Sequence, residues 1–283
     1  MFLHSKRLVA VASFLACNHI KDHIYAQEGL PTSQCACNTQ ETNKTAGISS
    51  LTVPQSVGCN WNSNWDLRGD NQKDEEKKSK GVSHQIILIR HGQYEFGDSD
   101  EKRVLTDLGR QQANRTGERL LELHNSGKIH PIKYVYYSPL ARATETHSTI
   151  SLHLPKTILK HNVQPCSMIR EGAVCVPCPI HPTWRPTDEM VAKDGARVEA
   201  AFINHMHRAD KTEDADYSTV LVCHGNVIRY FVMRALQLPT NAWLRTSVAN
   251  SSITIINVSP SGNVSLQCMG ESGHLLAHQI TFN

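Results

Sequence analysis

The sequence predicts an α/β fold, a three-layer sandwich in which helices cover both faces of a mostly parallel central sheet. Two continuous apolar runs, Ile86–Ile89 and Thr219–Cys223, contain no charged residue, which is typical of strands buried on both faces. A helix is predicted after each run, from Leu105 to about Ser126 and from Val227 to Leu236. The second helix has an apolar stripe that suits packing on a sheet.

The rest of the chain continues this alternation of strands and helices. Tyr134–Tyr137 is the next candidate strand, and a helix opens at Leu140 directly after a proline. A further helix is expected from Thr187 to about Asp210. Ser252–Val258 and Val264–Cys268 then form a terminal hairpin.

Local signals set the ends of the first helix. Thr106 is a good N-cap, and Asp107 is favourable in the first turn because its charge opposes the helix dipole. Asn125, Ser126 and Gly127 are typical of a helix end.

Composition bounds the class of protein. The chain has 283 residues, of which 40% are hydrophobic and 19% charged, so it suits one large globular domain with extensions. The net charge is only +3, and no block of Lys and Arg with interleaved aromatics is present. Nucleic-acid binding is therefore not predicted.

Nine cysteines are too few for a disulfide scaffold of this length, so the core must come from apolar burial. Cys166, Cys175, Cys178 and His181 have a spacing that could hold zinc. A second Cys-x-x-Cys pair is missing, which favours free thiols or a disulfide. No cofactor and no metal are predicted.

Residues 1–27 are predicted to be a targeting or membrane-anchor segment. Lys6 and Arg7 precede the apolar run Leu8–Cys17, which has the length of a signal-peptide core but is short for a membrane span of about 20 residues. A cleaved secretory signal, an organelle-targeting segment and a marginal anchor all fit this pattern, and the pattern alone slightly favours secretion.

Residues 28–82 are predicted to be a flexible linker, and the folded domain should occupy 83–283. Within the linker, the Trp segment, residues 61–66, contains Trp61 and Trp65 and ends at Asp66. It either docks on the chain's own domain or binds another subunit, since aromatic residues anchor interfaces.

Charged and nucleophilic side chains are predicted to meet at one edge of the sheet. Arg90 and His91 end the first apolar run, and His224 ends the later one. The carboxyl edge of an α/β sheet is where ligands bind. Arg142 lies in the first turn of a helix, where anions are favoured, although a surface ion pair with Glu145 is a competing interpretation.

These residue types suit phosphoryl transfer. Arg90 and Arg142 can grip phosphate oxygens bidentately, and nearby guanidinium charges should lower the pKa of a histidine and keep it neutral. One histidine can then attack phosphorus while the other donates to the equatorial oxygens. Glu171 can protonate the leaving oxygen.

At these residues the sequence resembles the histidine phosphatase superfamily, in its phosphoglycerate-mutase-like branch. The resemblance covers about residues 84 to 270. It implies that His91 forms a phosphohistidine, that Arg90, Arg142 and His224 bind the phosphate, and that Glu171 donates the proton. The matching segments are Leu88–Gly92, Leu105–Ala113, Ser138–Thr146, Arg170–Gly172 and Cys223–Asn226.

Within this branch the chain is most similar to mitochondrial serine/threonine phosphatases of the phosphoglycerate-mutase family. Asp194–Phe202, His207–Asp210 and Asn226–Tyr230 carry this closer likeness, as does the Trp segment, with Asn62 where the family has Asp. The resemblance implies that the Trp segment (Trp61, Trp65, Asp66) supports a homo-oligomer, at least a dimer. It favours the mitochondrion, with membrane association, over secretion.

The leading hypothesis is a metal-independent phosphatase whose partners are proteins phosphorylated on serine or threonine. A phosphoglycerate-type mutase or a phosphatase of small phosphate esters is the first alternative. Gln93–Phe96 differs from the mutase pattern Glu-Ser-x-x-Asn after Arg-His-Gly, which disfavours a mutase. A non-enzymatic scaffold that recruits partners through the Trp segment is the second alternative.

Overall fold

The structure, a computed structural model, describes residues 61–68, 81–159 and 162–282. The chain divides into two units, Met1–Asn60 and Trp61–Asn283, and only the second is described. The predicted targeting segment and most of the predicted linker therefore lie outside the described residues. Within the described ranges, no helix is long and apolar enough to cross a membrane.

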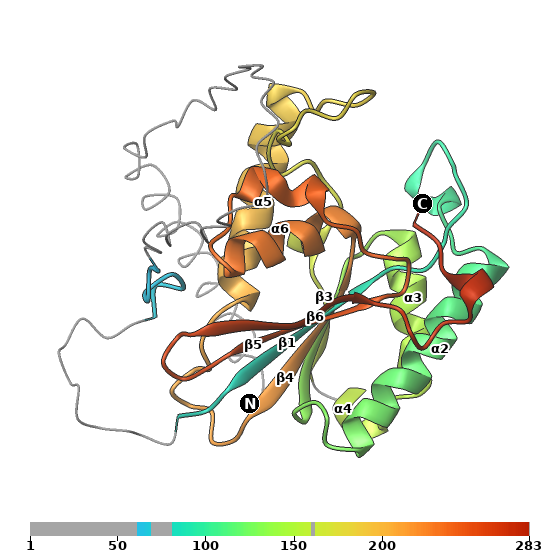
Figure 1. The fold of residues 1–283 in the computed structure, drawn as a ribbon. Coiled ribbons are helices and arrows are strands. Elements are labelled where there is room, and N and C mark those ends of the chain that lie inside the picture. Colours follow the sequence, from blue (N-terminus) through green and yellow to red (C-terminus); the bar gives the residue numbers. More distant parts are fainter. Residues whose placement is uncertain (1–60, 69–80, 160–161, 283) are drawn as a thin grey trace, which may run out of the picture. The chain divides into compact units, whose positions relative to one another are not determined.

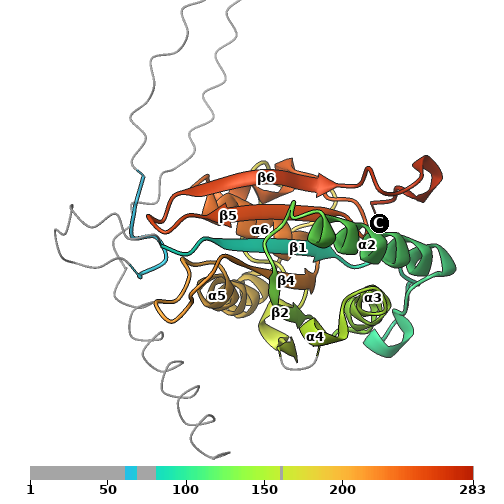
Figure 2. The same cartoon turned by 90° about the horizontal axis from the view of Figure 1, so that it is seen from below.

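A six-stranded sheet forms the centre of the domain, with the strand order β3-β2-β4-β1-β5-β6. Figure 2 shows β2, β4, β1, β5 and β6 in this order. The four strands from β3 to β1 pair in parallel, and β5 runs antiparallel to both of its neighbours. The strands are β1 His84–Arg90, β2 Ile132–Tyr137, β3 Val163–Pro165, β4 Tyr217–Cys223, β5 Ile253–Val258 and β6 Val264–Glu271.

Helices cover both faces of this sheet. α5 and α6 lie on one face, and α2, α3 and α4 lie on the other (Figure 1). The predicted three-layer α/β fold is thus confirmed. The helices are α2 Asp107–Asn125, α3 Ala141–Ser151, α4 Lys156–Leu159, α5 Asp188–His205 and α6 Gly225–Ala235, with short 3₁₀ turns η1 Asp100–Lys102, η2 Ser167–Ile169, η3 Thr240–Arg245 and η4 Ala277–Gln279.

The apolar run in β1 serves both cores because alternate side chains point to opposite faces. Ile86 and Leu88 pack in the cluster under α5 and α6. Ile87 and Ile89 pack in the cluster under α2 and α3. Every residue of β1 and of β4 is buried, as the unbroken apolar runs predicted.

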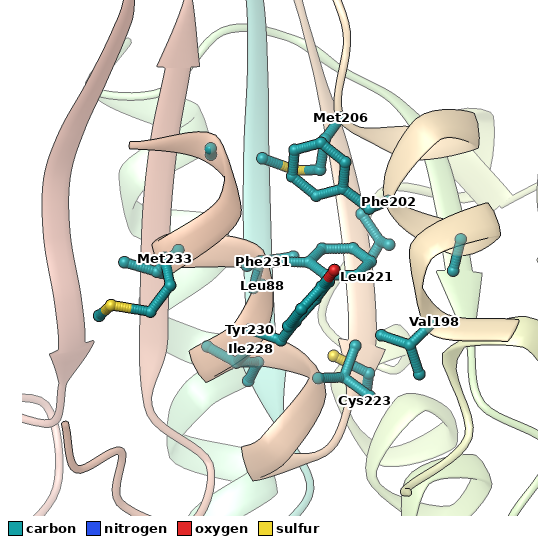
Figure 3. Packing of buried hydrophobic residues seen from close by; sticks show 14 of the residues in the cluster. Leu88, Val198, Phe202, Met206, Leu221, Cys223, Ile228, Tyr230, Phe231 and Met233 are labelled. Atoms are coloured by element: carbon teal, nitrogen blue, oxygen red, sulfur yellow. The ribbon is translucent and has the colours of Figure 1, made fainter. Parts of the chain in front are cut away.

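The larger core lies between the sheet and the pair α5 and α6 (Figure 3). Phe202 of α5 and Phe231 of α6 meet edge to face, with ring centroids 5.5 Å apart. Such pairs contribute about 0.5–1.5 kcal/mol beyond the area they bury. These contacts fix both helices on the strands that carry the candidate site.

The predicted helix bounds are confirmed for α2, where the Thr106 side chain accepts a hydrogen bond from the Gly109 N–H. The prediction for α5 was too long at its end. Its N-cap is Thr187, as expected, but the helix ends at His205 because Met206 has extended backbone angles, φ −104° and ψ 93°. The short edge strand β3 was not predicted.

The Trp segment packs on the domain, although it precedes the predicted domain start at residue 83. Trp65 is 3% exposed, contacts the ring of Phe202, and donates from Nε1 to the Gly262 carbonyl at 2.8 Å. The buried Asp66 carboxylate pairs with Arg208. This docking on the chain's own domain is the first of the two interpretations offered for the segment.

Acid should destabilise the fold through buried His84. Its Nδ1 bonds to the His207 carbonyl and its Nε2 to Thr219, and burial lowers its pKa to about 3. Well above pH 6.5 the His84 ring is neutral in both the folded and the unfolded protein, so the free energy of unfolding does not change. Below pH 6.5 only the unfolded ring takes a proton, and at pH 5 the loss reaches about 2 kcal/mol.

Urea unfolding of the wild type and of His84→Gln at pH 7.5 and pH 5.0 measures this loss. The variant should lose about 2 kcal/mol less stability between the two pH values than the wild type. Equal losses for both proteins would contradict the assignment.

Candidate active site

The in-register pairing of β1 with β4 brings the two candidate histidines together. Arg90 lies opposite Cys223 in the parallel ladder, so the next residues, His91 and His224, leave the sheet side by side. Their ring centroids are 5.1 Å apart. The structure therefore brings these two residues together at the carboxyl edge of the sheet, as the sequence predicted.

The backbone around His91 is fixed by three hydrogen bonds. Its N–H donates to the Cys223 carbonyl at 3.0 Å. Its carbonyl accepts from the Ser251 N–H at 3.2 Å and from the Asn250 side chain at 3.3 Å. The neighbouring strand β4 and the loop before β5 thus hold the residue rigidly.

The side-chain contacts of His91 define its tautomer. Nδ1 lies 2.8 Å from the Gly92 carbonyl, which can only accept, so Nδ1 carries the proton. Nε2 then has a lone pair and accepts from Arg142 Nε at 3.3 Å. Burial first, and the charges of Arg90 and Arg142 second, hold the pKa of His91 well below its usual value. The ring is neutral and can act as a nucleophile.

His224 is anchored through one ring nitrogen. Its Nε2 lies 2.7 Å from the hydroxyl of buried Ser138, the residue that follows β2. Its Nδ1 is buried and has no hydrogen-bond partner among the residues that the structure describes. Burial, and then the neighbouring His91, lower the pKa of His224 well below its usual value. A neutral ring that accepts from Ser138 presents Nδ1–H to an incoming oxygen.

Arg142 points into the site and not to the surface. It is 5% exposed, lies over the ring of Tyr94 at 4.8 Å, and has Nη1 3.6 Å from Asp100. The competing ion pair with Glu145 is not formed, because Glu145 accepts from Arg110 Nε at 2.7 Å. The helix N-terminus and the guanidinium together make this corner strongly cationic.

The Arg90 guanidinium is held by two backbone carbonyls. Its Nη1 donates to the Val248 carbonyl at 2.8 Å and to the Phe282 carbonyl at 3.2 Å. Burial lowers the pKa of Arg90 to about 10, so the guanidinium stays charged at neutral pH. Arg90 thus contributes a positive charge whose position is fixed by these backbone contacts.

Glu171 supplies the carboxyl group. Burial raises the pKa of Glu171, while Arg142 and Arg90 oppose the rise. A raised pKa keeps part of the population protonated, which a general acid needs. Burial therefore shifts the two groups in opposite directions: it lowers the pKa of His91 and raises the pKa of Glu171.

A close contact of two glycines joins the loop after His91 to the start of α2. A Cβ on Gly92 would lie 2.6 Å from the Gly109 carbonyl oxygen, and a Cβ on Gly109 would lie 1.9 Å from the Gln93 carbonyl oxygen. Neither position has room for a side chain. The start of α2 can therefore pack directly on the loop that leaves His91.

Several site residues were missed from the sequence. Tyr94 meets the His91 ring edge-on with centroids 5.2 Å apart, and Asp100 accepts from the Ala141 N–H at the start of α3. Ser138 was noted only as part of a motif. Their roles depend on long-range contacts that no local pattern reports.

The cysteine cluster does not gather around one point. All five described cysteines are free thiols. Cys166 contacts His205 at 3.5 Å, whereas Cys178 lies near Arg245 at 3.9 Å. In the described part of the chain, no group of three or more His, Cys, Asp or Glu side chains could hold a metal ion.

Comparison with known proteins assigns the chain to a family. Residues 86–164 and 180–269 match the histidine phosphatase superfamily (branch 1). The chain belongs to this superfamily. The matched residues include Arg90, His91, Arg142 and His224, which are four of the five predicted site residues, whereas Glu171 lies between the two matched ranges.

Two curated relatives have the same kind of name. The mitochondrial serine/threonine-protein phosphatase Pgam5 of Drosophila grimshawi is 43% identical over 239 residues, which are 78% of this chain and 80% of the relative. The protein named PGAM5 in Xenopus laevis is 41% identical over 250 residues, 82% of this chain and 87% of its own. A solved phosphoglycerate mutase of Plasmodium falciparum is 29% identical, with a TM-score of 0.46, and covers 68% of this chain and 92% of its own.

Loss of the Ser138 hydroxyl should slow turnover. Ser138→Ala removes the 2.7 Å hydrogen bond that orients His224, and a bond worth about 1–1.5 kcal/mol corresponds to a rate loss of about tenfold. The measurement is kcat with p-nitrophenyl phosphate. Ser148→Ala, which removes an exposed hydroxyl from α3, is the matched control, and equal rates for both variants would refute the role.

Proposed function

We propose that the protein is a metal-independent phosphatase that removes phosphate from phosphoserine or phosphothreonine in proteins, through a phosphohistidine at His91. The names of the relatives support the substrate class. The observation that carries the proposal is the unprotonated Nε2 of His91, which contacts the buried Arg142 guanidinium, while the His91 ring lies beside a second neutral histidine, His224.

In the first step, Nε2 of His91 attacks phosphorus and the phosphorus–oxygen bond to the serine or threonine side chain breaks. Arg90, Arg142 and the Nδ1–H of His224 bind the equatorial oxygens, whose charge is spread in the transition state. Glu171 gives its proton to the leaving oxygen, so the product leaves as an alcohol. The enzyme then holds phosphohistidine and a Glu171 carboxylate.

In the second step, water attacks the phosphohistidine. The Glu171 carboxylate takes a proton from this water, the nitrogen–phosphorus bond breaks, and inorganic phosphate leaves. The lone pair returns to Nε2 of His91 and Glu171 is protonated again. Positive charge in the site comes from arginine throughout, so the scheme requires no metal ion.

Location in the mitochondrion is part of the proposal, supported by the printed names of the relatives. The apolar run Leu8–Cys17 would target or anchor the chain. It lies outside the described residues. Secretion through the same run remains the alternative, and retention of a tagged full-length chain in mitochondria would decide between them.

Replacement of His91 should abolish both the covalent intermediate and turnover. His91→Asn keeps a polar side chain but has no nucleophilic nitrogen, so acid-labile phosphate should not attach to the protein and phosphate release from a phosphoserine peptide should stop. His278→Asn, an exposed histidine in η4, is the control and should behave as the wild type. Hydrolysis that persists in His91→Asn would mean another nucleophile.

A substrate panel separates the proposal from its alternatives. Phosphopeptides should be hydrolysed with a higher kcat/KM than 3-phosphoglycerate or other small phosphate esters. Interconversion of phosphoglycerates at a rate equal to hydrolysis would instead indicate a mutase.

We further infer a homo-oligomer that depends on the Trp segment. Trp65 and Asp66 already contact the chain's own domain, whereas Trp61 is only partly buried and its buried Nε1 has no hydrogen-bond partner among the described residues. Trp61→Ala should therefore lower the mass measured by light scattering while the domain stays folded. Trp184→Ala, at a tryptophan that is 37% exposed, is the control, and an unchanged mass in Trp61→Ala would refute the inference.

A further inference from the structure

Glu171 differs from the other site residues because no strand or helix holds it. It lies in the acid loop, defined here as residues 168–173, which begins within η2 and continues from Arg170 without helix or strand structure. Backbone groups of such a segment need partners elsewhere, and without them the segment would sample many conformations. The position of the carboxyl group therefore depends on whatever holds this loop.

One arginine of α5 binds three successive parts of the acid loop. Arg197 Nη1 donates to the Met168 and Arg170 carbonyls, both at 2.7 Å, and Nη2 donates to the Glu171 carbonyl at 3.1 Å. The side chain is only 16% exposed. A planar guanidinium has donors in a fixed arrangement, which suits this simultaneous contact.

Asp194, one turn earlier on α5, completes the contact. Its Oδ1 pairs with Arg197 Nη2 at 2.8 Å, and its Oδ2 accepts from the Ala173 N–H at 3.1 Å. Gly172 lies between the two side chains so closely that a Cβ would be 2.5 Å from each of them. The Gly172 carbonyl accepts from Asn226 of α6 at 3.4 Å. The loop is thus held along its length by α5 and α6.

We propose that Arg197, braced by Asp194, is a positioning residue that aims the Glu171 carboxyl group at the leaving oxygen. This inference rests on the proposed function, in which Glu171 is the proton donor. Arg197 contacts the loop only through backbone carbonyls, so it acts on where Glu171 lies. Its loss should therefore impair proton donation selectively and leave the attack by His91 intact.

The sensitivity of the reaction to the leaving group measures this selectivity. Nitrophenolate is a weak base that leaves without a proton, whereas the alkoxide of serine requires one. The values of kcat/KM for p-nitrophenyl phosphate, phenyl phosphate and a phosphoserine peptide report the step in which the first bond breaks. If the Glu171 carboxyl group is misplaced, kcat/KM should fall strongly for the phosphoserine peptide and weakly for p-nitrophenyl phosphate.

The main variant is Arg197→Lys, which keeps the charge but loses the planar set of donors. We expect a loss of up to about a hundredfold in kcat/KM for the phosphoserine peptide, since a small misplacement can cost this much. The loss for p-nitrophenyl phosphate should be less than about twofold, because that ester bypasses the proton. Asp194→Asn should give the same pattern with smaller losses. It replaces Arg197→Lys in the test if that variant does not fold.

Two controls set the scale. Glu171→Gln removes the donated proton itself and should lower kcat/KM for the phosphoserine peptide by a factor of about 10²–10⁴. Glu199→Gln changes another residue of α5. It removes the ion pair between Glu199 and Arg234 of α6, and this pair does not involve the acid loop. The effect of Glu199→Gln should be equal across the three substrates. Thermal unfolding checks that the variants stay folded.

The double variant Glu171→Gln/Arg197→Lys completes the test. If Arg197 works through Glu171, the double variant should be no slower with the peptide than Glu171→Gln alone. Additive losses, or equal losses for all three substrates in Arg197→Lys, would overturn the positioning role and leave the proposed function intact. An absence of leaving-group sensitivity in Glu171→Gln itself would overturn both.

Discussion

β1 and β4 pair in parallel from His84 opposite Tyr217 to Arg90 opposite Cys223, and the candidate site depends on this register. A shift by one residue would point Ile87 and Ile89 toward the wrong core and would separate the two histidines along the edge. The alternating burial of β1 against both helical layers opposes such a shift. The packing that stabilises the fold is therefore also what fixes the distance between His91 and His224.

Burial then determines the protonation states at this edge. The charges of the neighbouring guanidiniums by themselves favour a neutral His91, yet desolvation is the larger cause of its lowered pKa. The same desolvation raises the pKa of Glu171 against the pull of Arg142 and Arg90. One low-dielectric environment thus favours the neutral form of both an imidazole and a carboxyl group, which are the forms needed for attack and for proton donation.

The site is held in two different ways. His91 and His224 directly follow β1 and β4, and Arg142 lies in the first turn of α3, so regular elements place all three residues. Glu171 lies on an irregular loop whose carbonyls are bound by Arg197 of α5. The packing of α5 against α6 through Phe202 and Phe231 therefore matters to the site as well as to the core, because a helix that shifted would carry the loop with it.

The sequence by itself determined the strands, the caps and the residues that follow them, because periodicity, N-caps and apolar runs are local signals. It could not decide that Arg142 bonds to His91 while Glu145 turns to Arg110, or that Trp65 packs on Phe202. It also placed the end of α5 too late, because Met206 leaves the helix for an extended conformation that the sequence pattern does not mark. Such partners are far apart in the chain, and only the packing of the folded elements selects them.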